Sequence, residues 1–129
     1  MAAEPEPVWK NKNLSTQWNT AVKIGGYLYG FDGDSGGSGN LRCVNWQTGT
    51  VAWEQPLGFG SVTAADGRLL VLTAKGALYT APASPRAFTP TGRMRVLKAD
   101  CWTAPVLANG LLYCRNSHGA LVCLDLHAE

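Results

Sequence analysis

Short apolar runs dominate the chain, and none of them has the spacing of a helix. No window of a dozen residues places apolar side chains at i, i+3, i+4 and i+7 beside a helix cap. The runs are instead rich in β-branched and aromatic residues and are separated by Gly, Asn, Asp and Pro, as is typical of strands joined by turns. They predict strands at 21–24, 27–31, 41–44, 51–54, 69–73, 77–81, 94–97, 111–115 and 120–124. The chain is therefore expected to be all-β.

One unit of strand, tight turn and strand occurs three times in the sequence. The segments GGYLYGF (25–31), DGRLLVL (66–72) and NGLLYCR (109–115) each place a glycine before apolar strand residues, and a second glycine opens the next strand. These repeat-turn glycines are Gly26 and Gly39, Gly67 and Gly76, and Gly110 and Gly119. The first members of the pairs are 41 and 43 residues apart. A period of about 40–45 residues with four short strands is typical of a β-propeller blade, which buries its faces by stacking on its neighbours.

The repeat divides the chain into about three four-stranded antiparallel blades. We expect blade 1 at 15–56, blade 2 at 57–98, and blade 3 at 99–126 without its outer strand. Residues 8–14 are expected to form an outer strand that completes another blade, between a disordered leader (1–7) and a tail (127–129). Propellers close with about 4–8 blades, so three blades leave the ring open. We favour closure as a homodimer by strand exchange; a tetramer or a fragment of a longer propeller are the alternatives.

The stretch NWQTGTVAW (45–53) resembles the tryptophan docking motif of PQQ-like β-propellers. The matching residues are Asn45, Thr48, Gly49 and Trp53, with Asn where the family usually has Asp. The second copy is degenerate, because Pro82 replaces the Asp and no tryptophan follows at the docking position. The resemblance covers nearly all of 8–126 and implies a propeller in which Trp53 packs on the neighbouring blade. It also implies a bacterial protein of a periplasmic or extracytoplasmic family.

Three further tryptophans fit the repeat. Trp9 has the place of the last strand of a preceding unit, whereas Trp18 and Trp102 occupy matching places ahead of the first strands of blades 1 and 3. We interpret them, like Trp53, as structural residues rather than ligand-binding ones.

The resemblance leaves several functions open. Enzymes of the family hold PQQ and calcium at the ring centre with a catalytic Asp, a stacking Trp and often a disulfide between adjacent cysteines. This sequence has no adjacent cysteine pair and no evident central Asp–Arg–Glu cluster. We therefore expect no cofactor and a non-enzymatic scaffold or interaction module, whose partners are a second copy of itself and other proteins. The alternatives are a fragment of a PQQ-dependent dehydrogenase and a propeller that binds a small ligand or carbohydrate.

The pentapeptide GDSGG (33–37) matches the serine loop of chymotrypsin-like proteases and the G-x-S-x-G elbow of α/β-hydrolases. A hydrolase elbow needs a helix directly after Ser35, but a strand pattern follows. The chymotrypsin arrangement needs a histidine before the serine, but His118 and His127 both come after it. A calcium loop opening at Asp32 fails too, because Cys43 stands where a glutamate is needed. We predict no catalytic residue and no metal site.

Composition excludes further classes. A net charge of +2 without a basic run argues against nucleic acid, and no apolar stretch is long enough to span a membrane. No signal peptide is visible at the N-terminus. The cysteines at 43, 101, 114 and 123 form no C-x-x-C pair and are interpreted as buried thiols, with a Cys114–Cys123 disulfide as the alternative.

Overall fold

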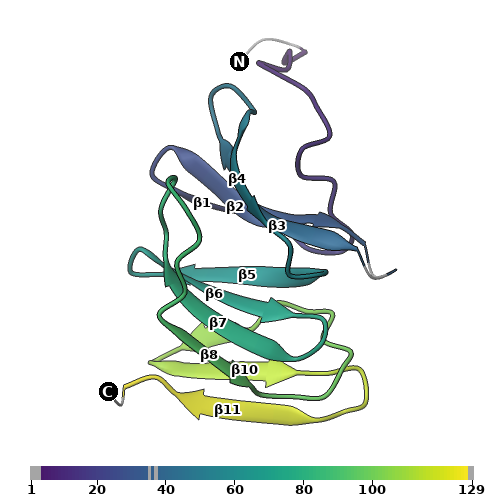
Figure 1. The fold of residues 1–129 in the computed structure, drawn as a ribbon, viewed down its shortest axis with the longest axis vertical. Coiled ribbons are helices and arrows are strands. Elements are labelled where there is room, and N and C mark those ends of the chain that lie inside the picture. Colours follow the sequence, from purple (N-terminus) through teal and green to yellow (C-terminus); the bar gives the residue numbers. More distant parts are fainter. Residues whose placement is uncertain (1–3, 35, 37, 128–129) are drawn as a thin grey trace.

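A computed structural model describes residues 4–34, 36 and 38–127 (Figure 1). The regular secondary structure of these residues consists of β-strands alone, and the strands form three antiparallel sheets. The first sheet has the order β1 (Val22–Ile24), β2 (Tyr27–Gly33), β3 (Gly39–Asn45) and β4 (Val51–Gln55). The second has β5 (Gly60–Ala65), β6 (Arg68–Thr73), β7 (Ala77–Pro82) and β8 (Gly92–Arg95). The third has β9 (Val106–Ala108), β10 (Leu111–Arg115) and β11 (Leu121–Asp125). The all-β prediction is confirmed.

The sheets, called blades 1, 2 and 3 below, stack in chain order with blade 2 in the middle (Figure 1). Each is a meander in which consecutive strands pair, as expected when short turns join antiparallel strands. The face that a blade turns toward the next blade along the chain is called its leading face, and the opposite one its trailing face. Alternate residues of a strand point to opposite faces, so both faces can be read from the register.

Two apolar layers hold the stack together. The layer between blades 1 and 2 consists of the buried residues Tyr29, Phe31, Leu41, Cys43, Phe59, Val62, Leu69 and Val71. The layer between blades 2 and 3 consists of Leu70, Leu72, Leu78, Cys101, Leu112 and Cys114. Strand β6 supplies both layers, which explains why its sequence is continuously apolar rather than alternating. Burying a side chain of this size contributes about 1.5–3 kcal/mol, so the middle blade is the most strongly held.

The turns between first and second strands differ among the blades. In blades 2 and 3 both central residues have positive φ: Asp66 (51°) with Gly67 (72°), and Asn109 (53°) with Gly110 (75°). This is the pattern of a type I′ hairpin turn. In blade 1 the positive φ falls on Gly25 (59°) and not on the repeat glycine Gly26. A positive φ at the first central position alone is the pattern of a type II′ turn, which GG permits equally well.

The second glycines of the repeat also have two different roles. Gly76 and Gly119 have φ of 94° and 89°, whereas Gly39 is not among the residues with positive φ. A Cβ on Gly76 would collide with the carbonyl oxygen of Leu97, and a Cβ on Gly39 would lie 2.9 Å from the carbonyl oxygen of Gly58. Gly39 is therefore needed for the close approach of two backbones rather than for its φ.

Candidate functional site

Asn45 organises the turn that follows β3. Its side-chain Oδ1 accepts the backbone N–H groups of Gln47 (2.9 Å) and Thr48 (3.1 Å). Its carbonyl oxygen accepts the N–H of Gly49 (2.8 Å), and its own N–H donates to the carbonyl oxygen of Thr50 (2.8 Å). Asparagine thus makes the local side-chain-to-backbone bonds that an aspartate makes in such turns. Gly49 is buried with φ of 76°, and the hydroxyls of Thr48 and Thr50 are 2.8 Å apart.

The turn leads into β4, where Trp53 reaches the next blade. The indole N–H of Trp53 donates to the carbonyl oxygen of Ser84 (2.7 Å), just after β7. Its ring packs against Tyr29 of blade 1 and Phe88 in the β7–β8 connection, with ring centroids 6.1 and 5.9 Å apart. In Figure 1 that connection extends from blade 2 along blade 1. Trp53 therefore joins the outer edges of blades 1 and 2.

Trp9 has the same relation to blade 1 that Trp53 has to blade 2. Its indole N–H donates to the carbonyl oxygen of Trp46 (2.8 Å), just after β3. A Cβ on Gly49 would come within 2.6 Å of the Trp9 ring, so this glycine is needed for the ring to fit over the turn. Counted from the second glycine of each repeat, the two acceptor carbonyls differ by one position. Trp9 thus makes on blade 1 the same kind of indole-to-carbonyl contact that Trp53 makes on blade 2.

The residues after Trp9 cover part of the trailing face of blade 1. The side-chain amides of Asn11 and Asn13 donate to the carbonyl oxygen of Gly49 (3.0 and 2.8 Å). Arg42, on the same face, donates to the carbonyl oxygen of Asn13 (2.9 Å). Residues 8–14 form no strand in this single chain, and the expectation that they complete another blade as its outer strand stays a prediction. The segment has no blade edge beside it to pair with, so its polar groups bind the turn instead.

Two carboxylates hold Arg42 in place on the trailing face of blade 1. The guanidinium forms ion pairs with Asp32 (3.3 Å) and Glu54 (3.0 Å). Register explains the second pair, since Arg42 on β3 lies directly opposite Glu54 on β4. The trailing face therefore combines a fixed charge cluster with the apolar residues Leu28 and Val44, which line a cavity of about 200 Å³ beneath Trp9.

The leading faces of the three blades differ sharply in exposure. Leu41, Leu78 and Leu121 each stand two residues after the second glycine of their repeat. Their exposed fractions are 0% and 3% in blades 1 and 2 and 69% in blade 3. The same position is thus buried in blades 1 and 2, which have a next blade, and open in blade 3, which has none among the described residues.

The leading face of blade 3 is a continuous open surface. Val106, Tyr113 and Cys123 lie side by side across β9, β10 and β11. Val106 is 61% exposed, and a shallow cavity of about 230 Å³ lies between it, Tyr113, Arg115 and Leu121. Met94 on β8 is also half exposed, and the sheet of blade 3 has three strands in the described residues. We call the open set Val106, Tyr113, Leu121 and Cys123 the blade 3 face.

The cysteines lie on different faces of their strands. Cys43, Cys101 and Cys114 are buried free thiols, whereas Cys123 is exposed. Cys114 lies opposite Val122, and Cys123 lies opposite Tyr113, in two neighbouring cross-strand pairs. Because neighbouring pairs face opposite sides of a sheet, Cys114 and Cys123 lie on opposite faces of blade 3. The alternative of a Cys114–Cys123 disulfide is therefore wrong. Burial raises the pKa of the Cys114 thiol to about 11, and it also raises the pKa of Cys43 and Cys101.

The GDSGG stretch forms the connection between β2 and β3. Gly33 and Gly39 are the last cross-strand pair of that hairpin, and the Asp34 carboxylate accepts the N–H of Gly36 (2.8 Å). Ser35 and Gly37 lie outside the described residues. A strand and not a helix follows the loop, which is the arrangement of a hairpin rather than of a hydrolase elbow.

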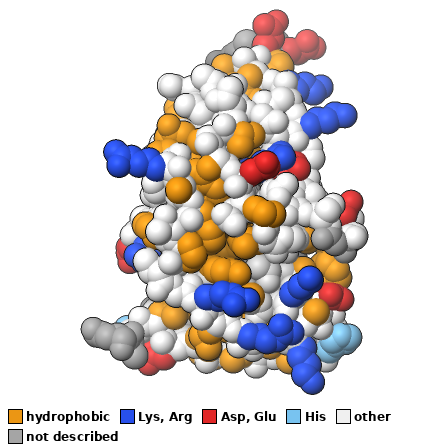
Figure 2. Space-filling model, in the orientation of Figure 1, with side chains coloured by type: hydrophobic (Ala, Val, Ile, Leu, Met, Phe, Trp, Pro, Cys, Tyr) orange, Lys and Arg blue, Asp and Glu red, His pale blue; other side chains and the backbone are white. Residues whose placement is uncertain are grey.

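A basic cavity lies between blades 1 and 2 at their outer edge. Lys75, Arg93 and Arg95 line a space of about 430 Å³, and the Arg93 guanidinium lies over the Tyr79 ring at 5.5 Å. Figure 2 shows Lys and Arg side chains gathered on the lower half of the visible face, below a band of hydrophobic side chains.

A larger cavity, of about 540 Å³, lies where the chain enters the innermost strands of all three blades. Trp18 and Trp102, the matching tryptophans ahead of β1 and β9, meet there edge to face with ring centroids 5.4 Å apart. PQQ carries carboxylates and is held with calcium, but no charged side chain lines this cavity. No group of three or more His, Cys, Asp or Glu that could hold a metal occurs in the part of the chain that the structure describes. The residues of the cavity do not fit PQQ with calcium.

Comparison with known proteins identifies the fold. No protein-family model matches the chain, and no curated protein sequence matches it. Among solved structures the chain is similar to BamB from Moraxella catarrhalis, a β-propeller, with a TM-score of 0.67 and 22% identity over 83% of this chain. The three sheets are therefore propeller blades. The chain spans 33% of the length of that BamB chain. Residues 4–34, 36 and 38–127 contain no helix able to cross a membrane.

Proposed function

We propose that this protein is a non-enzymatic propeller scaffold that associates with a second copy through the blade 3 face. The exposure of Leu121, at 69% against 0% and 3% for its repeat equivalents, is the observation that carries the proposal. In blades 1 and 2 this position packs on the trailing face of the next blade. The face that would cover Leu121 in our proposal is the trailing face of blade 1 of a second copy, which presents Leu28 and Val44 beside the Arg42 cluster.

The N-terminal segment supports the same arrangement. Trp9 docks on blade 1 as Trp53 docks on blade 2, and Trp53 belongs to the outer strand of the preceding blade. By that correspondence residues 7–11 take the place of β4 (Val51–Gln55). Blade 3 of a second copy, which lacks an outer strand, is the blade that they would complete. The segment would then pair with β11 of the other chain while Trp9 keeps its observed contact on its own blade 1.

Ring closure supports an assembly of two copies. A propeller of this kind closes with about 4–8 blades, so two copies with three blades each fall inside the range and a single copy falls below it. A symmetric pair also uses both open faces twice, leaving neither exposed. The assembled ring would be a rigid interaction module, consistent with a propeller fold without a fitted cofactor site.

The mass in solution tests the proposal, by size-exclusion chromatography with light scattering. We expect the wild-type chain to be a dimer and Leu121→Glu to be a folded monomer, because the glutamate would be buried on a face where Asp32 and Glu54 already pair with Arg42. Ala87→Glu is the matched control, since Ala87 is an exposed apolar residue in the β7–β8 connection, away from the blade 3 face. It should remain a dimer. A wild-type monomer at every concentration, or a dimeric Leu121→Glu, would contradict the proposal.

A further inference from the structure

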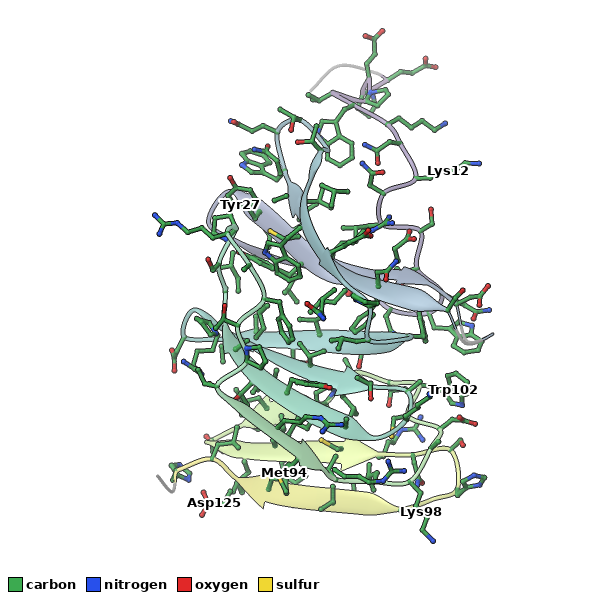
Figure 3. The ribbon with its side chains drawn as sticks, in the orientation of Figure 1. Lys12, Tyr27, Met94, Lys98, Trp102 and Asp125 are labelled. Atoms are coloured by element: carbon green, nitrogen blue, oxygen red, sulfur yellow. The ribbon has the colours of Figure 1, made fainter. Side chains whose placement is uncertain are left out.

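The cavity between the inner strands has a composition that the scaffold proposal does not use. Its floor is the start of β5, with Ser61 and Val62, and its walls are the segments leading into β1 and β9. Figure 3 shows Trp102 at the edge of the molecule where β5 begins. At about 540 Å³ the space lies within the range of about 300–1,000 Å³ typical of small-molecule sites.

Three repeat-equivalent aromatic residues differ in exposure, and one of them is open to solvent at the cavity. Trp18, Phe59 and Trp102 stand at the same distance before the first repeat glycine of their blades. Phe59 is 3% exposed and packs on Phe31 of the preceding blade, with ring centroids 6.4 Å apart. Trp18 is 66% exposed and meets Trp102 across the cavity instead. Core packing therefore accounts for Phe59 and for the half-buried Trp102, which packs against the layer between blades 1 and 2, but it does not account for the exposed Trp18.

A buried hydroxyl supplies the second, independent observation. Ser61 lines the cavity and is 2% exposed, but its Oγ has no hydrogen-bond partner in the described structure. A buried polar group without a partner costs about 1–3 kcal/mol, so such groups normally have one. Thr20 and Thr103 bring two more hydroxyls to the same lining. A ligand hydroxyl that reached the Ser61 Oγ, which is sealed from solvent in the free chain, would give it the missing partner, and the two threonines would be further contacts.

The absence of charge in the lining sets the ligand class. The cavity is lined by tryptophan, valine, alanine, hydroxyl and amide side chains, so a carboxylate or phosphate ligand would be buried without a counter-charge. Aromatic rings favour ligands with an apolar C–H face, and hydroxyls and amides favour ligands with polar edges. We propose that this cavity is a binding site for a neutral carbohydrate, whose pyranose ring packs on Trp18 and Trp102 and whose hydroxyl bonds to Ser61.

The test is a titration of the ¹⁵N-labelled full-length chain with cellobiose, a neutral sugar with two apolar ring faces, followed by NMR. The indole N–H signals are assigned with single Trp→Phe variants. We expect the signals of Trp18 and Trp102 to shift in a saturable way, while that of Trp46, an exposed tryptophan outside the cavity, stays in place. No shift up to the solubility limit of cellobiose, or equal shifts at all indoles, would overturn the proposal. Stronger binding of glucuronate, the charged probe, would overturn the neutral class.

Ser61→Ala separates a ligand contact from a merely structural residue. Removing the unpartnered hydroxyl should raise the melting temperature of the free protein and weaken cellobiose binding by about fivefold, the size of one lost hydrogen bond. A structural role would instead lower the melting temperature and leave the affinity of the folded protein unchanged. Leu121→Glu should keep wild-type affinity, which distinguishes failure of the sugar site from failure of the assembly. Trp46→Phe, the matched aromatic control, should also bind as the wild type does.

Discussion

Blades 2 and 3 are copies of one repeat, but they sit in different surroundings. Blade 2 has a blade on each face, and its central strand β6 is buried along nearly its whole length. Blade 3 has a neighbour on its trailing face only, and the residues of β11 alternate between half-buried and exposed. The apolar pattern of β11 follows that of β7, so the difference in exposure between the two strands comes from their neighbours and not from their sequences.

The largest expected difference in unfolding free energy is between alanine variants of Leu78 in blade 2 and Leu121 in blade 3, which occupy the same repeat position. Leu78→Ala should lower the free energy of unfolding by about 2–5 kcal/mol, because it leaves a cavity in the layer between blades 2 and 3. Leu121→Ala should have almost no effect on a monomer, since the side chain is mostly exposed. Urea unfolding followed by tryptophan fluorescence measures both. If the loss of unfolding free energy caused by Leu121→Ala grows with protein concentration, the contact that the variant removes lies between two chains. A concentration-independent cost as large as that of Leu78→Ala would contradict the exposure difference.

Trp53 and Trp9 provide the next comparison. Trp53 docks from a strand of a four-stranded blade, whereas Trp9 docks from a segment that belongs to no sheet. Trp53→Phe removes the bond to the Ser84 carbonyl from a packed aromatic group, and we expect a loss of about 1–3 kcal/mol in unfolding free energy. Trp9→Phe should cost less in the monomer, because its contacts are at the exposed end of the chain. Amide hydrogen exchange of β4 and of residues 9–14 locates each effect.

The dimer would reverse the order of these two variants. If residues 7–11 complete a blade of the other chain, Trp9→Phe should weaken association and raise the dissociation constant. An unchanged dissociation constant would show that the Trp9 contact serves its own chain alone.

Local patterns predicted the blades well but said little about their neighbours. The spacing of Gly26, Gly67 and Gly110 is set by the number of strands per blade, so it could be read from the sequence. Which of Gly25 and Gly26 takes the positive φ could not, because two glycines permit either turn type. The convergence of Trp18 and Trp102 was also invisible, since it depends on how three blades fan out around their inner strands. Their equal distance from the repeat glycines was the signal that could have paired them.

Cys114 and Cys123 lie on the buried and the exposed face of one hairpin, so their thiols should differ in pKa and in reactivity. Burial raises the pKa of the Cys114 thiol from 9.0 to about 11 in the folded chain. As pH rises from about 9 to 11, the Cys114 thiol therefore loses its proton in the unfolded chain before it does so in the folded chain. The free energy of unfolding falls over this window, whereas below pH 9 the protonated thiol stabilises the folded state in full. Cys114→Ala should flatten the fall of the melting temperature over that window. Leu112→Ala, a buried neighbour without an ionisable group, should lower the melting temperature without flattening it.

Solvent exposure predicts a second difference between these thiols. Iodoacetamide should modify Cys123 in the native protein and leave Cys114 unmodified, as mass spectrometry of tryptic peptides would show. Protection of Cys123 that increases with protein concentration would place it under a second copy. Rapid modification of Cys114 under native conditions would contradict its burial between blades 2 and 3.

The smallest expected effects compare the docking turn of blade 1 with its degenerate counterpart in blade 2. Asn45→Asp keeps both side-chain bonds to the N–H groups of Gln47 and Thr48, so unfolding free energy should change by only a few tenths of a kcal/mol, as for the interchange of these residues at helix N-caps. Asn45→Ala removes both bonds and should cost about 1 kcal/mol. Pro82 stands at the equivalent position in blade 2, where no docking tryptophan follows, and Pro82→Asn should therefore gain nothing comparable. Equal losses for Asn45→Asp and Asn45→Ala in thermal unfolding would show that the turn is held by Trp9 and Gly49 rather than by its own side-chain bonds.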